Sequence, residues 1–231
     1  RGLSAILPGS MGGILVAIDG PAGSGKSSVA RAVAARLGVV NLNTGAAYRA
    51  AALLALRENV DLADGEGLAA LARRVELDPE GASIDGARVG EPELRSPDVS
   101  VAASKVSAHV SLREVLLPVQ RAAAEKARAQ GGGVVEGRDI GTVVLPDAEL
   151  KVYLSAAPEE RARRRAYQTG REGELDRIRA AIARRDRQDS EREISPLKPA
   201  ADALVLDTTS LSLEEVISRV LDLAIDLRGQ T

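Results

Sequence analysis

The feature that most constrains the fold is a glycine-rich stretch near the start of the chain, GPAGSGKS at Gly20–Ser27. It matches the pattern G-x-x-x-x-G-K-[ST] at every specified position. A short apolar run, Ile14 to Asp19, comes before it, and apolar residues recur at helical spacing over Lys26 to Leu37. A strand, a glycine turn and a helix in this order predict a phosphate-binding loop, or P-loop.

The chemistry of phosphate binding accounts for these residue types. Glycines let backbone N–H groups turn inward around a phosphate, and the start of the following helix adds positive potential. Lys26 is spaced to reach the β- and γ-phosphates of a nucleotide, and the Ser27 hydroxyl to hold Mg²⁺. The alternative is a glycine turn that binds no ligand, and the flanking strand and helix argue against it.

Strands and helices alternate along the remaining chain. Helical spacing of apolar residues covers about 45–58, 64–74, 97–108, 111–129, 158–168 and 174–191. Strand patterns lie at 134–136, 150–154 and 203–206. A last helix begins at Ser212, where Glu215 completes a capping box. The alternation predicts a three-layer α/β fold, in which helices flank a central parallel sheet.

The length of 231 residues suits one α/β domain with a sizeable core, which we place at 13–231. Residues 61–97 are rich in turn formers and include the hairpin dipeptide Asp85-Gly86, so they predict an insertion rather than core. Residues 1–12 are mildly apolar but contain a Pro-Gly pair. We interpret them as an expression remnant or a disordered leader, rather than as a signal peptide.

The composition argues against several classes of function. The net charge is −2, and the chain has three Tyr and no Phe or Trp, so neither charge nor aromatic surface favours binding to nucleic-acid polymers. The absence of cysteine excludes disulfides and thiolate chemistry and is compatible with a reducing cytoplasm. His109 is the only histidine, which argues against a catalytic triad or a multi-histidine metal site. No apolar run approaches the roughly 20 residues of a membrane helix.

Three further motifs carry polar side chains suited to a phosphorylated substrate. T-G-x-x-Y-R at 44–49 lies near the start of a predicted helix. E-G-R-D-x-G-T at 136–142 follows a predicted strand, and ligands bind at such carboxyl ends in open parallel sheets. R-x-x-x-D-x-x-R at 185–192 places its charged residues on one helical face.

Taken singly, these motifs have simpler explanations. Arg49 could be a solvated helix residue, and Arg185 with Asp189 a surface ion pair of little energetic value. Two predicted strands also end in an acid that could assist a metal, one at Glu136 and one at Asp207. We favour Glu136, because a glycine-flanked Arg-Asp pair follows it and packing requires no such pair in a loop.

In this order behind a P-loop, the motifs resemble bacterial-type cytidylate kinases, in the superfamily of P-loop nucleoside monophosphate kinases. The commoner forms of the first two motifs have Ser where Thr44 stands and Asp where Glu136 stands, and both changes keep the functional group. The resemblance runs from about Ile14 to the final helix. It implies an enzyme that uses ATP and Mg²⁺ to phosphorylate CMP or dCMP in the cytoplasm. We expect a monomer.

The resemblance also implies roles for the matching residues. The acceptor phosphate would be held by Thr44, Arg49, Arg138 and Arg192. The ribose hydroxyls would be held by Asp189 with Arg185, and the cytosine edge read by Ser104, Arg113 and Asp139. The catalytic cations would be Lys26, Arg138, Arg185 and Arg192, and the metal would contact Ser27. ATP would contact Gly20, Pro21, Ala22, Gly23, Ser24, Gly25, Lys26, Ser27, Ser28, Arg161 and Arg165, with Arg164 able to replace one of the last two.

The resemblance further implies a monophosphate-binding insertion at about 45–110 and a lid at about 165–177. Two other functions stay open. A P-loop kinase for uridylate, thymidylate, shikimate or dephospho-coenzyme A could use similar arginines. A nucleotide-dependent switch or assembly ATPase would need only the loop, although the guanine-reading pattern N-K-x-D is absent. An acceptor panel separates these functions.

Overall fold

The computed structural model describes residues 13–230. The interpretation of residues 1–12 as a remnant or leader therefore lies outside the described residues. Within residues 13–230, every helix is too short or too polar to cross a lipid bilayer.

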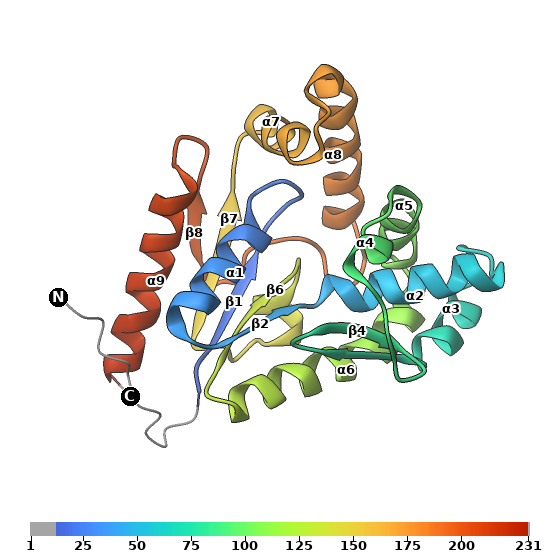
Figure 1. Ribbon diagram of the computed structural model, residues 1–231, viewed down its shortest axis with the longest axis horizontal. Coiled ribbons are helices and arrows are strands. Elements are labelled where there is room, and N and C mark those ends of the chain that lie inside the picture. The colour runs from blue at the N-terminus through green and yellow to red at the C-terminus, as the bar shows by residue number, and fades with distance from the viewer. Residues whose placement is uncertain (1–12, 231) are drawn as a thin grey trace.

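Five strands of the described chain form a parallel sheet: β1 Leu15–Asp19, β2 Val40–Asn43, β6 Gly133–Glu136, β7 Leu150–Ser155 and β8 Leu204–Asp207. Their order across the sheet is β2-β6-β1-β7-β8 (Figure 1). Every residue of the central strand β1 is buried, because β6 and β7 pair with its two edges and helices cover both faces. The predicted α/β fold with a central parallel sheet is confirmed.

Side chains of β1 alternate between the two faces of the sheet, as the two-residue period of a strand requires. Leu15 and Ala17 join an apolar cluster that includes residues of α6 (Val110–Ala129). Val16 and Ile18 join a second cluster with residues of α1 (Lys26–Leu37) and α9 (Leu213–Gln230). The two clusters hold the carboxyl end of β1 in a fixed position between helical layers.

Small side chains build much of the core, since the chain contains no Phe or Trp. The helix α2 (Gly45–Glu58) buries a row of alanines, Ala46, Ala47, Ala50, Ala51, Ala52 and Ala55. Alanine allows helix backbones to approach closely, and α2 packs along α5 (Pro97–Val106). This packing places the start of α2, with its T-G-x-x-Y-R motif, beside β6.

The segment after α2 adds a small antiparallel sheet to the parallel core. It contains α3 (Gly65–Ala72), β3 (Val75–Asp78), β4 (Gly81–Ile84), β5 (Ala87–Arg88) and α4 (Glu91–Leu94) (Figure 1). The predicted hairpin is confirmed: Asp85 and Gly86 both have positive φ, 52° and 77°, as a type I′ turn requires.

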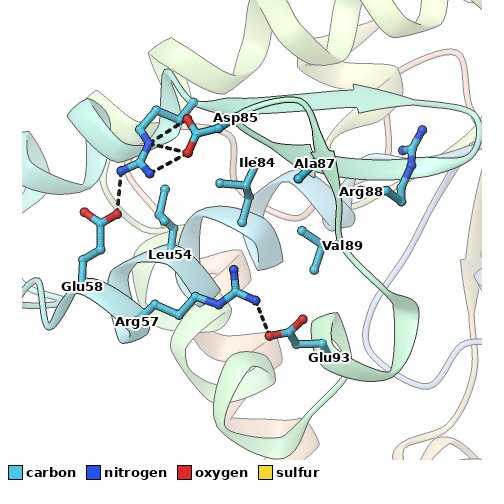
Figure 2. A pocket seen from close by; sticks show the side chains of 10 residues that line it. Leu54, Arg57, Glu58, Ile84, Asp85, Ala87, Arg88, Val89 and Glu93 are labelled. Atoms are coloured by element: carbon cyan, nitrogen blue, oxygen red, sulfur yellow. Dashed lines mark hydrogen bonds and ion pairs between the residues drawn. The ribbon is translucent and has the colours of Figure 1, made fainter.

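A pocket of about 460 Å³ lies between α2 and this small sheet (Figure 2). Leu54, Ile84 and Val89 supply its apolar wall. Most of its charged rim residues pair with one another: Arg74 bridges Asp85 and Glu58 at 2.6 Å each, and Arg57 contacts Glu93 at 2.5 Å. None of the motif residues lines this pocket, so we do not assign the chemistry to it.

Two helices stand above the carboxyl edge of the parallel sheet in Figure 1. They are α7 (Pro158–Thr169) and α8 (Leu175–Ser190), joined by a short 3₁₀ turn, η2 (Glu172–Glu174). A separate apolar cluster of Ala162, Ala166, Ile178 and Ile182 holds them together. The pair forms a helical hairpin whose α8 carries the R-x-x-x-D-x-x-R motif.

The boundaries predicted from the sequence agree with the structure to within a few residues for most elements. The elements β2, β3 and α4 were not predicted. A single turn of π-helix, η1 (Ile140–Val144), replaces the loop expected after the E-G-R-D sequence.

The capping box of α9 is formed as predicted. The Glu215 N–H donates to Ser212 Oγ at 3.2 Å, and the Ser212 N–H donates to Glu215 Oε2 at 2.8 Å. We expect Ser212→Ala to lower the free energy of unfolding by about 1 kcal/mol, measured by urea denaturation. The control is Ser218→Ala, at an exposed site within the same helix, where alanine is the better helix former. Equal losses in both variants would contradict a capping role.

Candidate active site

The P-loop turns at the carboxyl end of β1, as predicted. Its glycines adopt backbone conformations that other residues rarely reach: φ is +144° at Gly20 and +77° at Gly23. A Cβ atom at Gly20 would lie 2.1 Å from the carbonyl oxygen of Leu154 in β7, so the turn is also packed against the neighbouring strand.

The Lys26 side chain is buried inside this loop. Its Nζ donates to the Pro21 carbonyl at 2.6 Å and lies 3.4 Å from Ser24 Oγ. Burial, followed by the nearby Arg138 cation, holds the pKa of Lys26 well below its usual range. A phosphate bound in the loop would give Lys26 an ionised acceptor in place of these neutral oxygens.

Ser27 and Glu136 meet between the loop and the end of β6. The Ser27 hydroxyl donates to Glu136 Oε2 at 2.6 Å. Asp207, the other acid considered for the metal, lies at the end of β8 and accepts the Thr209 N–H instead. No group of three or more His, Cys, Asp or Glu side chains in residues 13–230 is placed to hold a metal. A hydroxyl and one carboxylate nevertheless fit Mg²⁺, which takes few protein ligands together with substrate phosphates.

A buried ion pair joins the E-G-R-D loop to α6. Arg113 pairs with Asp139 through Nη2, and both side chains are more than nine-tenths buried. The Arg113 guanidinium also lies 5.3 Å from the centre of the Tyr48 ring and donates to the Ser107 carbonyl. The structure thus brings together two of the three residues expected to read the base. Ser104 bonds instead to Gln188 of α8 at 3.2 Å.

Thr44 caps the start of α2 beside the end of β6, and Arg49 lies in the second turn of the same helix. The Thr44 hydroxyl donates to the Glu136 carbonyl at 2.9 Å. Arg49 is half-buried, and its buried Nη1 has no hydrogen-bond partner among the described residues. Burial, with the Arg95 cation next, lowers the pKa of Arg49 to about 10. A cation in this position is suited to an incoming anion.

Asp189 forms ion pairs with the remaining arginines of the three motifs. Its carboxylate pairs with Arg192 and with Arg138, the latter at 3.1 Å, and lies 3.9 Å from Arg185. Burial favours the protonated acid, but the three cations outweigh it and hold the pKa of Asp189 below its usual range. Asp189 is only 2% exposed, so the alternative of a surface Arg185–Asp189 pair is wrong. Burial, then Arg138, lowers the pKa of Arg185 to about 10.

The three arginines of α7 that are expected near ATP differ in their partners. Arg161 is buried, pairs with Asp186 of α8 and donates to the carbonyl of Ala22 in the P-loop at 3.0 Å. Arg164 pairs with Glu160 and donates to the Thr208 carbonyl at 2.6 Å. Arg165 is exposed and makes no ion pair with any residue in 13–230. Whether Arg161 or Arg165 contacts ATP stays a prediction.

Several residues in this region were missed by sequence reasoning. Asp19 precedes the first loop glycine, and Asp186 follows Arg185 within the helical motif; both accept backbone N–H groups of the site. Tyr48 lies inside a motif but had no role assigned. Adjacency to a motif was the available signal for all three. Arg95 carried no such signal, since only the fold brings α4 near Arg49.

The fold and the site define a P-loop phosphotransferase: a loop built for nucleotide phosphates lies opposite arginines on α2, α8 and the loop after β6. The family model for cytidylate kinase matches residues 16–226. The chain therefore belongs to the cytidylate kinase family, and the resemblance seen in the motifs is confirmed.

Curated relatives agree with this assignment. The chain is 47% identical over 216 residues to the cytidylate kinase of Desulfitobacterium hafniense (strain Y51), covering 90% of this chain and 91% of the relative. It is 48% identical over 221 residues to that of Rhodococcus opacus (strain B4), covering 92% and 95%. An uncharacterized protein from Eubacterium ventriosum ATCC 27560 has a crystal structure that aligns with a TM-score of 0.51. At 10% identity, over 91% of this chain and 98% of the other, that likeness shows the fold alone.

Arg49 and Arg113 should affect stability in opposite directions in the absence of substrates. Arg49→Met removes a poorly paired cation, and we expect it to raise the free energy of unfolding by about 1 kcal/mol. Arg113→Met leaves the Asp139 carboxylate buried without its partner and should lower that free energy by about 3 kcal/mol. Thermal unfolding of both variants beside wild type measures the difference. A loss of stability in Arg49→Met as large as in Arg113→Met would contradict this account of the charges.

Proposed function

We propose that the protein transfers the γ-phosphate of ATP to CMP or dCMP, giving ADP and CDP or dCDP. One observation carries the proposal: the P-loop lysine lies close to arginines of two other elements, Arg138 and Arg185, so donor and acceptor phosphates could meet there. The relatives named cytidylate kinase support the choice of acceptor.

The reaction needs no covalent enzyme intermediate. A phosphate oxygen of the acceptor bonds to the γ-phosphorus, while the bond from that phosphorus to the oxygen bridging it to the β-phosphate breaks, and ADP leaves. Positioning and cationic stabilisation supply the catalysis. We assign the stabilising cations to Lys26, Arg138, Arg185 and Arg192. Mg²⁺, when bound, would neutralise phosphate oxygens of ATP and would be held by the Ser27 hydroxyl and Glu136.

The acceptor roles follow the same geometry. Its phosphate would bind Thr44, Arg49, Arg138 and Arg192, and the buried Nη1 of Arg49 would gain the partner it lacks. Its ribose hydroxyls would bind Asp189 and Arg185. The cytosine amino group would donate to Asp139, and Arg113 would donate to the ring acceptors, with Ser104 as a third contact.

We also assign roles to the flanking segments. Residues 45–110 would form the monophosphate-binding insertion and residues 165–177 the lid, whose closure excludes water from the transfer. The loop from Gly20 to Ser28, with Arg161 and Arg165, would bind ATP. All of these residues belong to one chain, so a monomer suffices.

An acceptor panel tests the proposal. With MgATP, we expect kcat/KM for CMP and dCMP to exceed that for UMP, AMP and dTMP by at least about tenfold.

Lys26→Ala should lower transfer by at least about a hundredfold, because the donor phosphates lose their main cation. The control is Lys126→Ala, at an exposed site of α6, with circular dichroism to verify both folds. Wild type that phosphorylates no pyrimidine monophosphate would refute the proposal.

Asp139→Asn tests how the base is read. An amide can donate to O4 of uracil but is a weaker acceptor for the amino group of cytosine, so the preference for CMP over UMP should shrink by about tenfold. The measurement is the ratio of the two kcat/KM values. The control is Asp147→Asn, the same change at an exposed position just after η1. An unchanged ratio in Asp139→Asn would show that another group discriminates between the bases.

A further inference from the structure

We infer that Asp19 is a positioning residue, which fixes the base-reading Asp139 from the end of the phosphate-binding strand. The inference rests on the proposed function, because it concerns how that function selects its acceptor. The Asp19 carboxylate accepts the N–H of Ile140 at 2.8 Å and that of Gly141 at 2.7 Å. These two residues directly follow Asp139 in the chain. Asp19 itself is only 5% exposed.

The two N–H groups need an external acceptor. Ile140 and Gly141 begin the short helix η1, and the first N–H groups of a helix have no partner within it. Both residues are buried, so water is a poor substitute. The side chain of Asp139, which could cap the turn locally, makes no such bond and pairs with Arg113 instead. Asp19 therefore caps the turn, and Asp139 is left to pair with Arg113, the other residue proposed to read the base.

The backbone around Asp139 is held on both sides by β1. Before it, the Gly137 N–H donates to the Ile18 carbonyl at 3.1 Å. After it, the Asp19 carboxylate holds the next two amides. Asp139 has φ −144° and ψ 27°, outside the regular helix and strand regions, so local preference alone does not impose its conformation. The position of the base-reading carboxylate thus depends on a residue at the edge of the P-loop.

The charge of Asp19 serves this contact at a cost to the fold. Burial raises its pKa to about 6, and the Gly141 and Ile140 amides, with Lys26, oppose that rise. The groups that face it are Lys26 of α1, Asp139 and Tyr153 of β7. Because the folded-state pKa of about 6 lies above the ordinary value of 3.8, the free energy of unfolding falls as the pH rises from the lower of these values to the higher. A neutral side chain at this position does not carry that cost. Replacing Asp19 by Asn should therefore change the free energy of unfolding little, although it removes one of the two bonds to the loop.

Asp19→Asn is the test. The amide keeps the shape and one acceptor, but its NH₂ group would face a backbone N–H, so one loop amide loses its bond. We expect KM for CMP to rise by about tenfold and the CMP-to-UMP ratio of kcat/KM to fall by a similar factor. The dissociation constant of a non-hydrolysable ATP analogue should change by less than about twofold, because the loop's own amides hold the phosphates.

Glu149→Gln is the matched control. Its carboxylate accepts the Leu15 N–H at 2.8 Å, at the opposite end of β1, so the same chemical change is made away from the site. It should alter stability without altering the CMP-to-UMP ratio. If Asp19→Asn behaves like this control, with wild-type KM and ratio, Asp19 is only structural and the inference fails. If wild type itself does not phosphorylate CMP, the proposed function fails first.

Two further measurements complete the test. In the Asp139→Asn background, Asp19→Asn should reduce the ratio no further, and a second full reduction would mean that Asp19 does not act through Asp139. If Asp19→Asn does not fold, amide hydrogen exchange of the wild-type protein tests the same contact. The Ile140 and Gly141 amides should exchange slowly although they begin a helix, and rapid exchange of both would overturn the contact.

Discussion

The arrangement of the site depends on a concentration of positive charge that the protein itself neutralises only in part. Lys26 lies near Arg138 and Arg185, and burial together with neighbouring cations lowers the pKa of Lys26, Arg49 and Arg185. Asp189 compensates Arg138 and Arg192, but Nη1 of Arg49 is left without a hydrogen-bond partner among the described residues. Unpaired buried cations destabilise a fold. Under the proposed function, the same cations would stabilise the phosphates of two nucleotides without reorganisation at the moment of reaction.

The central strand β1 is bonded to the segments that we propose to bind the two substrates. Asp19 at its end holds the loop that carries Arg138 and Asp139. The Ala22 N–H in the P-loop donates to Asp186 of α8 at 3.1 Å, and Asp186 also pairs with Arg161 of α7. The loop after β6 is therefore bonded to the end of β1, and α7 and α8 are bonded to the P-loop that follows it. These bonds fix the two proposed binding segments relative to each other. In-line transfer needs such positioning, because small misplacements of the reacting atoms reduce the rate strongly.

Sequence reasoning succeeded where a short stretch contains its own structural signal. The bounds of α1 and the type I′ turn at Asp85-Gly86 agree with the structure, because helical periodicity and a positive-φ dipeptide are local properties. It missed β2 and β3, whose sequences VNLN and VELD are only four residues long and half polar. Pairing with a distant partner stabilises β2, where Val40 lies opposite Gly133 of β6. The strand β3 pairs with the neighbouring β4, but its short, half-polar sequence carries little strand signal of its own.

By itself, the sequence determined the P-loop, the alternation of strands and helices, and, through three motifs, the family. Only the tertiary structure decided which charges meet. It buries Asp189 among three arginines, pairs Arg161 with Asp186, and brings Asp19 to an amide 121 residues away. The physical reason is one of range. Periodicity, caps and turns are set within a few residues, whereas the charge and burial of a side chain depend on every element packed around it.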